Sequence, residues 1–331
     1  MEKLSFIKII FFLYLFSFIF NNESEKSSYS QLFDEIREYK VDKVLSSLPK
    51  RENTNILSMF IIMNNIKEEN SLNDAEAAFL TYKWIAQNIE VDCSDNDNNE
   101  SAVIAYNSGK ANFLGISNLF KTMCFHLNLK VDIISGYIKK LTNNDDGRII
   151  EKIKSFWNYI LINDTYYLVD ASMGAGTCDG DEFNKDNNDF FFATKPELFV
   201  RSHYPDMSKW QLLDKAIEDF TSMAFLRQFF YLNGFRTISP DYESLNLKKD
   251  SKIVLTFDKY NDDISVSVFY VTFDGNDFDY LSYDDFTISR GIVEVNLNLN
   301  TFDKNVVGLI IYAGKIDDEN LSSIAVYSVN Y

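Results

Sequence analysis

The chain has 331 residues, of which 46% are hydrophobic, 15% aromatic and 24% charged, and its net charge at pH 7 is −17. This length suits about two domains, and the hydrophobic fraction is that of an ordinary globular protein. The negative charge argues against nucleic acid or an anionic membrane surface as a partner, because both would repel the chain.

The first 20 residues differ in composition from the rest. Lys3 and Lys8 precede an uncharged apolar run from Ile9 to Phe20. Such a run is typical of a secretory signal peptide and is short for a transmembrane helix. We therefore predict that residues 1–20 are a signal peptide or an N-terminal anchor, which places the protein in the secretory route, extracellular or at the cell surface. Membrane contact is expected only through residues 1–20, if they stay uncleaved.

Helices are predicted next along the chain. Residues 21–70 are expected to form a helical N-terminal segment that packs on the core. Asn73 followed by Glu76 resembles a capping box, so a helix is expected over Asp74 to Ile89.

The stretch SGKANFLGISNLFKTMC (108–124) predicts a turn followed by a helix over 114–128. Ser108 and Gly109 supply the turn, and apolar residues then recur at helical spacing. The start of a helix after such a turn is a common place for a catalytic nucleophile, because the N–H groups stabilise negative charge. In this chain that place holds Asn112 and Phe113.

Strands dominate the rest of the sequence. The runs 156–162 and 166–172 flank Asn163, Asp164 and Thr165, which is a hairpin signal. After Pro240 come five alternating runs separated by Asp, Asn and Gly turns, which predict an antiparallel β-sandwich: 252–257, 264–273, 291–299, 306–313 and 323–329.

Three cysteines and two histidines limit the metal and disulfide chemistry. Cys124 follows the apolar stripe and is expected to be buried, whereas Cys93 and Cys178 lie in polar loops and could pair or remain free. No metal site and no cofactor are expected. The acidic loops 179–189 and 274–285 lack the EF-hand spacing and are interpreted as solvated loops.

Four N-x-S/T sequons occur, at Asn22, Asn99, Asn163 and Asn320. They suit a secreted chain, but asparagine is common throughout this sequence.

Five motifs occur in an order that resembles the transglutaminase-like superfamily, in the branch of kyphoscoliosis peptidase and the cytokinesis-associated transglutaminase-like proteins. The resemblance covers residues 45–330 and rests on these motifs: YKWIAQNIEVD (82–92), SGKANFLGISNLFKTMC (108–124), SGYIKK (135–140), FWNYILINDTYYLVDASMGAG (156–176) and FVRSHYPDMSKWQLL (199–213).

This resemblance implies an α+β fold, with a papain-like transglutaminase core of helices packed on an antiparallel sheet, followed by a C-terminal antiparallel β-sandwich. The expected division is a signal peptide or anchor (1–20), a helical segment (21–70), a transglutaminase-like core (71–215), a connecting region (216–245) and a β-sandwich domain (246–331).

The family's catalytic residues map onto this sequence only in part. Gly115, Ile116 and Ser117 match the element that follows the catalytic Cys by two residues, so the Cys position holds Phe113. The motif SFWN (155–158) matches HAWN, so the His position holds Ser155. Asp170 matches the retained Asp of the triad.

A phenylalanine has no nucleophilic atom, and a serine hydroxyl is no general base near neutral pH. Losing both groups removes on the order of 10⁶-fold of triad catalysis. We therefore expect a pseudoenzyme without catalytic residues, in which Phe113 fills the nucleophile position with apolar bulk. Gly115, Trp157 and Asn158 are its expected neighbours, and Ser155 is expected to hydrogen-bond Asp170.

The sequence thus predicts a non-catalytic protein-binding or scaffold module with a protein partner of open identity. One alternative is a thiol-dependent transglutaminase or peptidase with a relocated nucleophile, for which Cys178 with His203 is the conceivable pair, although His203 is interpreted as structural. Another alternative is a β-sandwich adhesin or glycan binder.

Overall fold

The computed structural model describes residues 30–94, 101–142, 147–214, 216–257, 263–297, 305–316 and 321–330. The predicted signal peptide or anchor, residues 1–20, lies outside these ranges. Within them, none of the helices combines the length and the apolar character that crossing a membrane requires.

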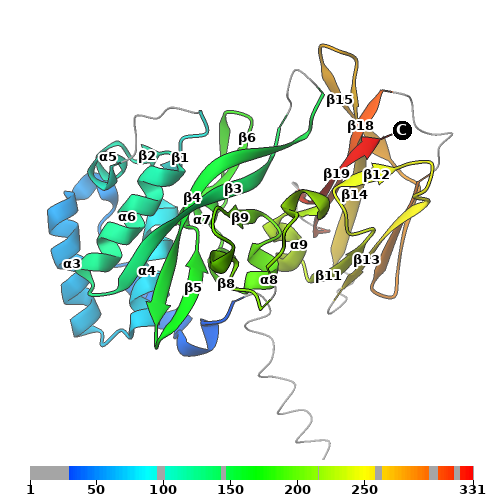
Figure 1. The fold of residues 1–331 in the computed structure, drawn as a ribbon. Coiled ribbons are helices and arrows are strands. Elements are labelled where there is room, and N and C mark those ends of the chain that lie inside the picture. The colour runs from blue at the N-terminus through cyan, green and yellow to red at the C-terminus, as the bar shows by residue number, and fades with distance from the viewer. Residues whose placement is uncertain are drawn as a thin grey trace, which may run out of the picture.

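Helices form one side of the N-terminal part of the molecule (Figure 1). They are α2 (Glu38–Leu45), α3 (Ile56–Glu69), α4 (Asp74–Asn88), α5 (Ala102–Ser108) and α6 (Phe113–His126), with 3₁₀ turns at Phe33–Glu35 and Arg51–Asn53. The predicted capping box is confirmed at the start of α4. Asn73 Oδ1 accepts from Glu76 N at 2.8 Å, and Glu76 Oε2 accepts from Asn73 N at 3.0 Å.

Glu76 also joins α4 to the chain before α2. Its carboxylate is fully buried and accepts from Arg37 Nε at 2.5 Å and from a terminal guanidinium nitrogen of Arg37 at 2.6 Å. A buried carboxylate needs such partners, because an unpaired one is costly. The capping box is therefore also an anchor for the N-terminal segment.

A five-stranded antiparallel sheet, in the order β8-β5-β4-β3-β9, lies against the helices. Its strands are β3 (Lys130–Leu141), β4 (Ile150–Ile162), β5 (Thr165–Val169), β8 (Phe192–Thr194) and β9 (His203–Pro205). The predicted hairpin is confirmed: β4 and β5 are joined at Asn163 and Asp164, which have φ of 49° and 59°. This left-handed pair matches the twist of the flanking strands.

Short elements complete this part. They are β1 (Glu90–Val91), β2 (Lys110–Ala111), α7 (Ala171–Ala175), β6 (Gly176–Asp179), β7 (Glu182–Lys185), α8 (Pro196–Phe199), and 3₁₀ turns at Ser208–Gln211 and Phe220–Ser222. β1 and β2 form a parallel pair and β6 and β7 an antiparallel hairpin.

Two further sheets enclose a second hydrophobic core at the C-terminal end (Figure 1). The larger follows the order β10 (Phe225–Leu226), β19 (Ser322–Asn330), β18 (Val306–Lys315), β14 (Ile264–Phe273) and β15 (Phe278–Tyr283), with β12 (Ser244–Asn246) pairing parallel to β19. The smaller follows the order β11 (Phe235–Ser239), β13 (Lys252–Phe257), β17 (Ile292–Asn296) and β16 (Phe286–Ser289), and α9 (Gln228–Leu232) precedes β11.

The predicted α+β class is therefore confirmed, with helices on an antiparallel sheet followed by mainly antiparallel strands. The stretch 216–245, expected to connect two domains, itself contributes β10, β11 and β12 to the C-terminal sheets. These strands are two to five residues long, which is too short to show an alternating pattern in the sequence.

The two cores meet where β3 and β4 extend toward the C-terminal sheets. A third apolar cluster there contains Ile149, Ile150, Phe225, Val271, Ile310 and Val326. Gly308 permits this approach, because a Cβ at this position would lie 1.9 Å from Ile149 Cδ1. Beside the cluster, the buried Lys139 Nζ lies 2.7 Å from Glu243 Oε2, so apolar packing and a buried ion pair join the two parts.

We predict that replacing Glu76 with Gln lowers the free energy of unfolding at pH 7 and flattens its dependence on acid pH. Burial alone would raise the pKa of Glu76, but hydrogen bonds from the Arg37 side chain and from backbone N–H groups outweigh it and lower the pKa. A carboxyl with a lowered folded-state pKa stabilises the fold above its ordinary pKa and loses that contribution as the pH falls through the folded value. Urea unfolding from pH 7 downward measures this.

The matched control for this experiment is Glu69→Gln, at an exposed position at the end of α3. The free energy of unfolding of Glu69→Gln should depend on pH in the same way as that of the natural chain. If Glu76→Gln and the natural chain kept a constant difference in unfolding free energy down to the most acid pH, the role given to this carboxylate would be wrong.

Candidate functional site: the start of α6 and the hollow beside it

The start of α6 is fixed by the residues just before it. Gly109 ends α5 with a left-handed φ of 72°, and Lys110–Ala111 then pairs with β1. Asn112 caps α6 by accepting from Gly115 N at 2.8 Å. Phe113 is the first residue of the helix, half-buried against the main core. The turn and the helix start expected from the sequence are thus formed, and Phe113 places an apolar ring at the first position of the helix.

The first turn of α6 packs directly on β4. Ser117 Oγ donates to the Phe156 carbonyl at 2.8 Å, and Asn158 Nδ2 donates to the Ser117 carbonyl at 3.1 Å. Since Ser117 follows Phe113 by one turn and Phe156 follows Ser155 directly, these bonds bring the helix start and the SFWN motif into one region. Gly115, Trp157 and Asn158, predicted as neighbours, are all buried there.

Ser155 is fully buried in β4, and its hydroxyl finds no hydrogen-bond partner among the described residues. The expected bond from Ser155 to Asp170 is therefore wrong. Across the sheet Ser155 faces Gly136, where a Cβ would lie 2.3 Å from the Tyr204 carbonyl oxygen and 2.5 Å from the Trp157 ring. Close packing of β9 and Trp157 over β3 leaves little free space around this hydroxyl.

Asp170 is held by other groups. It caps α7, where one carboxylate oxygen accepts from Ser172 N at 2.9 Å, from Met173 N at 3.1 Å and from the Ser172 hydroxyl. The other oxygen, Oδ2, lies 3.1 Å from His203 Nε2. Asp170 thus pairs with His203, the residue that the sequence analysis interpreted as structural.

Ser202, His203 and Asp170 form a hydrogen-bonded chain, since Ser202 Oγ lies 2.8 Å from His203 Nδ1. The order of groups is that of a hydrolase triad, but the surroundings are those of a core. The imidazole is 1% exposed and stacks on Phe199 at 3.9 Å, with the Trp157 ring 5.0 Å away. The imidazole is therefore enclosed by aromatic rings, whereas Ser202 is 6% exposed and lines the hollow described next.

A hollow of only ≈30 Å³ lies beside Phe113. Phe113, Met173 and Cys178 line it from the core, and Phe225, Arg227 and Gln228 line it from β10 and the start of α9. A volume of this size holds about one water molecule. Residues from the C-terminal side of the chain, Phe225, Arg227 and Gln228, therefore close this hollow. This cover had no signal in the sequence, because its residues lie more than 100 positions from Phe113.

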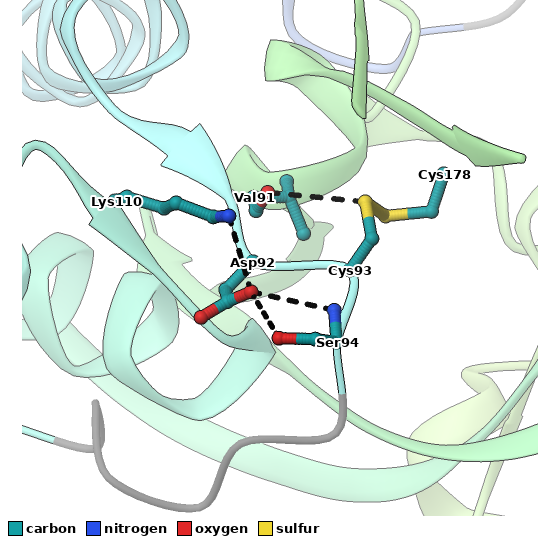
Figure 2. Close-up of a disulfide and its surroundings, with 6 residues drawn as sticks. All are labelled: Val91, Asp92, Cys93, Ser94, Lys110 and Cys178. Carbon is teal, nitrogen blue, oxygen red and sulfur yellow. Dashed lines mark hydrogen bonds and ion pairs between the residues drawn. A yellow bond between two sulfur atoms is a disulfide. The ribbon is translucent and has the colours of Figure 1, made fainter. Parts of the chain in front are cut away.

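Cys93 and Cys178 form a disulfide beside the hollow (Figure 2), with their Cα atoms 5.6 Å apart. Cys93 follows β1 and Cys178 belongs to β6. Asp92 fixes the loop at Cys93, because it accepts from the Ser94 hydroxyl at 2.7 Å and lies 3.3 Å from Lys110 Nζ. The sequence left open whether Cys93 and Cys178 pair, and the structure shows that they do. Neither of them is then a free thiol that could act as a nucleophile.

Cys124 is the remaining cysteine and is fully buried in α6. Burial raises the pKa of its thiol well above the ordinary value, so it is protonated at neutral pH and a poor nucleophile. The conceived pair of Cys178 with His203 is wrong, because each has another partner. Among the described residues, no group of three or more His, Cys, Asp or Glu side chains could hold a metal ion.

Comparison with known proteins identifies the fold class of this site. No family model matches the chain. Kyphoscoliosis peptidase of Mus musculus is 25% identical over 177 residues, which cover 51% of this chain and 27% of that protein. Hillarin of Drosophila melanogaster is 23% identical over 244 residues (67% and 29%), and the Lim and transglutaminase domain protein ltd-1 of Caenorhabditis elegans is 24% identical over 192 residues (52% and 26%).

The chain thus spans little more than a quarter of the curated relatives it matches. Among solved structures, a TGase crystal structure is 10% identical with a TM-score of 0.26, covering 54% of this chain and 41% of that one. Red sea bream transglutaminase is 8% identical, also with a TM-score of 0.26 (88% and 57%). At these scores the assignment rests on the sequence relatives. Their similarity supports a transglutaminase-like branch for this chain, the one in which kyphoscoliosis peptidase also falls.

We predict that removing the disulfide through Cys93→Ala with Cys178→Ala lowers the free energy of unfolding by roughly 4 kcal/mol, because the bond closes a loop of 85 residues that is free in the unfolded variant. Urea unfolding with and without reductant measures the effect. Reductant should shift the midpoint of the natural chain and of Cys124→Ala, and leave that of the double variant unchanged. If reductant left the urea midpoint of the natural chain unchanged, the pairing of Cys93 with Cys178 would be contradicted.

Proposed function

We propose that this chain is a non-catalytic transglutaminase-like protein that acts as a protein-binding or scaffold module in the secretory route or at the cell surface. The observation that carries the proposal is the site itself. Phe113 begins α6 and Ser155 stands on β4, where the resemblance requires a nucleophile and a general base. Neither side chain can carry out the corresponding step at neutral pH.

Access supports the same proposal. Residues of β10 and α9 cover the hollow beside Phe113, and the hollow has room for about one water. A peptidase or transferase needs an open cleft for an extended polypeptide, and the hollow offers none while the Phe113 ring lines it.

The disulfide supports the proposed location. Such bonds persist in oxidising compartments and are rare in the cytosol, and the Cys93–Cys178 bond agrees with the signal-like composition of residues 1–20.

The thiol-dependent alternative needs a cysteine that can act as a nucleophile. Cys93 and Cys178 are bonded to each other and Cys124 is buried, so none of the three is available. A β-sandwich adhesin or glycan binder stays a prediction. Aromatic side chains such as Phe235, Tyr283 and Tyr327 are buried inside the C-terminal core, so they cannot contact a partner. A partner would bind to side chains on the outer faces of the molecule.

We predict that the natural chain neither incorporates an amine into a glutamine-bearing protein nor cleaves a general peptide substrate. The double variant Phe113→Cys with Ser155→His should gain turnover above that of either single variant, because nucleophile and base act as a unit. Both assays are run on all four proteins at pH 7.

The control is Cys124→Ala in the background of the double variant, which should keep the gained turnover. Activity of the natural chain that thiol reagents abolish would overturn the proposal. An inert double variant with an intact fold would contradict the assignment of positions 113 and 155.

A further inference from the structure

The tip of the β4–β5 hairpin is an exposed turn that has no part in the hollow beside Phe113. Asn163, Asp164 and Thr165 are all exposed, and the first two form the left-handed turn. The Asn163 amide lies outside every hydrophobic core, and its Nδ2 donates to Glu35 Oε2 at 3.3 Å at the surface. A large group attached to this amide would displace no buried side chain.

The three residues are also a sequon for N-linked glycosylation. It requires Asn, then any residue except Pro, then a hydroxyl-bearing residue, and Asn163-Asp164-Thr165 fulfils this. The sequons at Asn22 and Asn320 have their asparagines outside the described residues, as does that at Asn99. Within the described ranges, Asn163 is therefore the sequon asparagine that the structure shows to be accessible.

We propose that Asn163 is N-glycosylated in the mature protein. This inference rests on the proposed secretory location, for which the Cys93–Cys178 disulfide is a second observation independent of the sequon. The donor is an oligosaccharide linked to a polyprenyl diphosphate. The bond from the first sugar carbon to the diphosphate breaks, a bond from that carbon to Asn163 Nδ2 forms, and the amide proton leaves with the diphosphate.

The position of the hairpin decides what the glycan leaves open. β4 has 13 residues, with Ile150 packed against the C-terminal sheets and Ile162 next to the glycosylated turn. At about 3.3 Å per residue, the glycan is about 40 Å from the joint between the two cores. The C-terminal sheets thus remain open to a protein partner.

Next to the hairpin lies a surface groove lined by aromatic side chains, which a glycan on the turn would shield from macromolecules. Tyr166 is 44% exposed and Phe125 71% exposed, and both line a surface groove with Tyr159 and Leu161. A glycan on the turn between Ile162 and Thr165 lies beside this groove and keeps a macromolecular partner away from it. Partner binding is therefore directed to the C-terminal half.

The test is peptide mass spectrometry of the full mature protein purified from its source, before and after an amidase that removes N-glycans and converts the carrier Asn to Asp. Asn163 should be converted. Asn163→Gln and Thr165→Ala should lose the modification, whereas Thr165→Ser should keep it. Asn128 is the internal control: it is exposed in a left-handed turn with φ of 60°, but Leu129 and Lys130 follow it, so it should stay unmodified.

The state of the cysteines, read in the same experiment, separates the two proposals. An unmodified Asn163 in protein whose Cys93–Cys178 bond is formed overturns this inference and leaves the proposed function standing. An unmodified Asn163 together with reduced Cys93 and Cys178 overturns the proposed location as well.

Discussion

The buried carboxylate of Asp170 organises the region on which the rest of the structure depends. Asp170 is 1% exposed and stands at the end of β5, at the start of α7 and against His203 of β9. A buried carboxylate is tolerated only when hydrogen-bonded throughout, and Asp170 receives two backbone N–H groups, a hydroxyl and an imidazole nitrogen. Removing the carboxylate would leave these donors unpaired and break the hydrogen bonds that join the end of β5 to α7 and β9. Asp170 therefore has a structural role that is independent of any catalytic one.

The same constraint shapes the covered site. Because Asp170 fixes α7 and His203, the chain that follows α7 runs past the start of α6, and Cys178 comes to lie beside Phe113 in the wall of the hollow. The disulfide to Cys93 then joins this wall to β1. Phe225, Arg227 and Gln228 close the hollow from the C-terminal side, and Lys139 with Glu243 holds that side in place. Burial lowers the pKa of Lys139, and Glu243 opposes this shift. Apolar packing, the ion pair and the disulfide thus join these elements into one packed unit.

Local chemistry made much of this fold predictable. The capping box at Asn73 and Glu76, the helix that follows Asn112 and the turn at Asn163 and Asp164 each depend on a few neighbouring residues. The pairing of Asp170 with His203 depends on residues 33 positions apart, and the disulfide on residues 85 apart, so no local pattern shows either. Phe113 and Ser155 were singled out through family motifs, and their assignment as replaced catalytic residues stays a prediction. That Phe225 and Gln228 line the hollow together with Phe113 follows only from tertiary packing.

Mass spectrometry of the natural, unreduced protein after treatment with a thiol-reactive reagent at neutral pH tests whether the folded chain holds a reactive thiol. Because Cys93 and Cys178 are bonded to each other and Cys124 is buried, we expect no labelling of the three cysteines in the folded chain. All three should be labelled after unfolding in reductant. Rapid labelling of any one of them in the folded, unreduced protein would contradict this expectation.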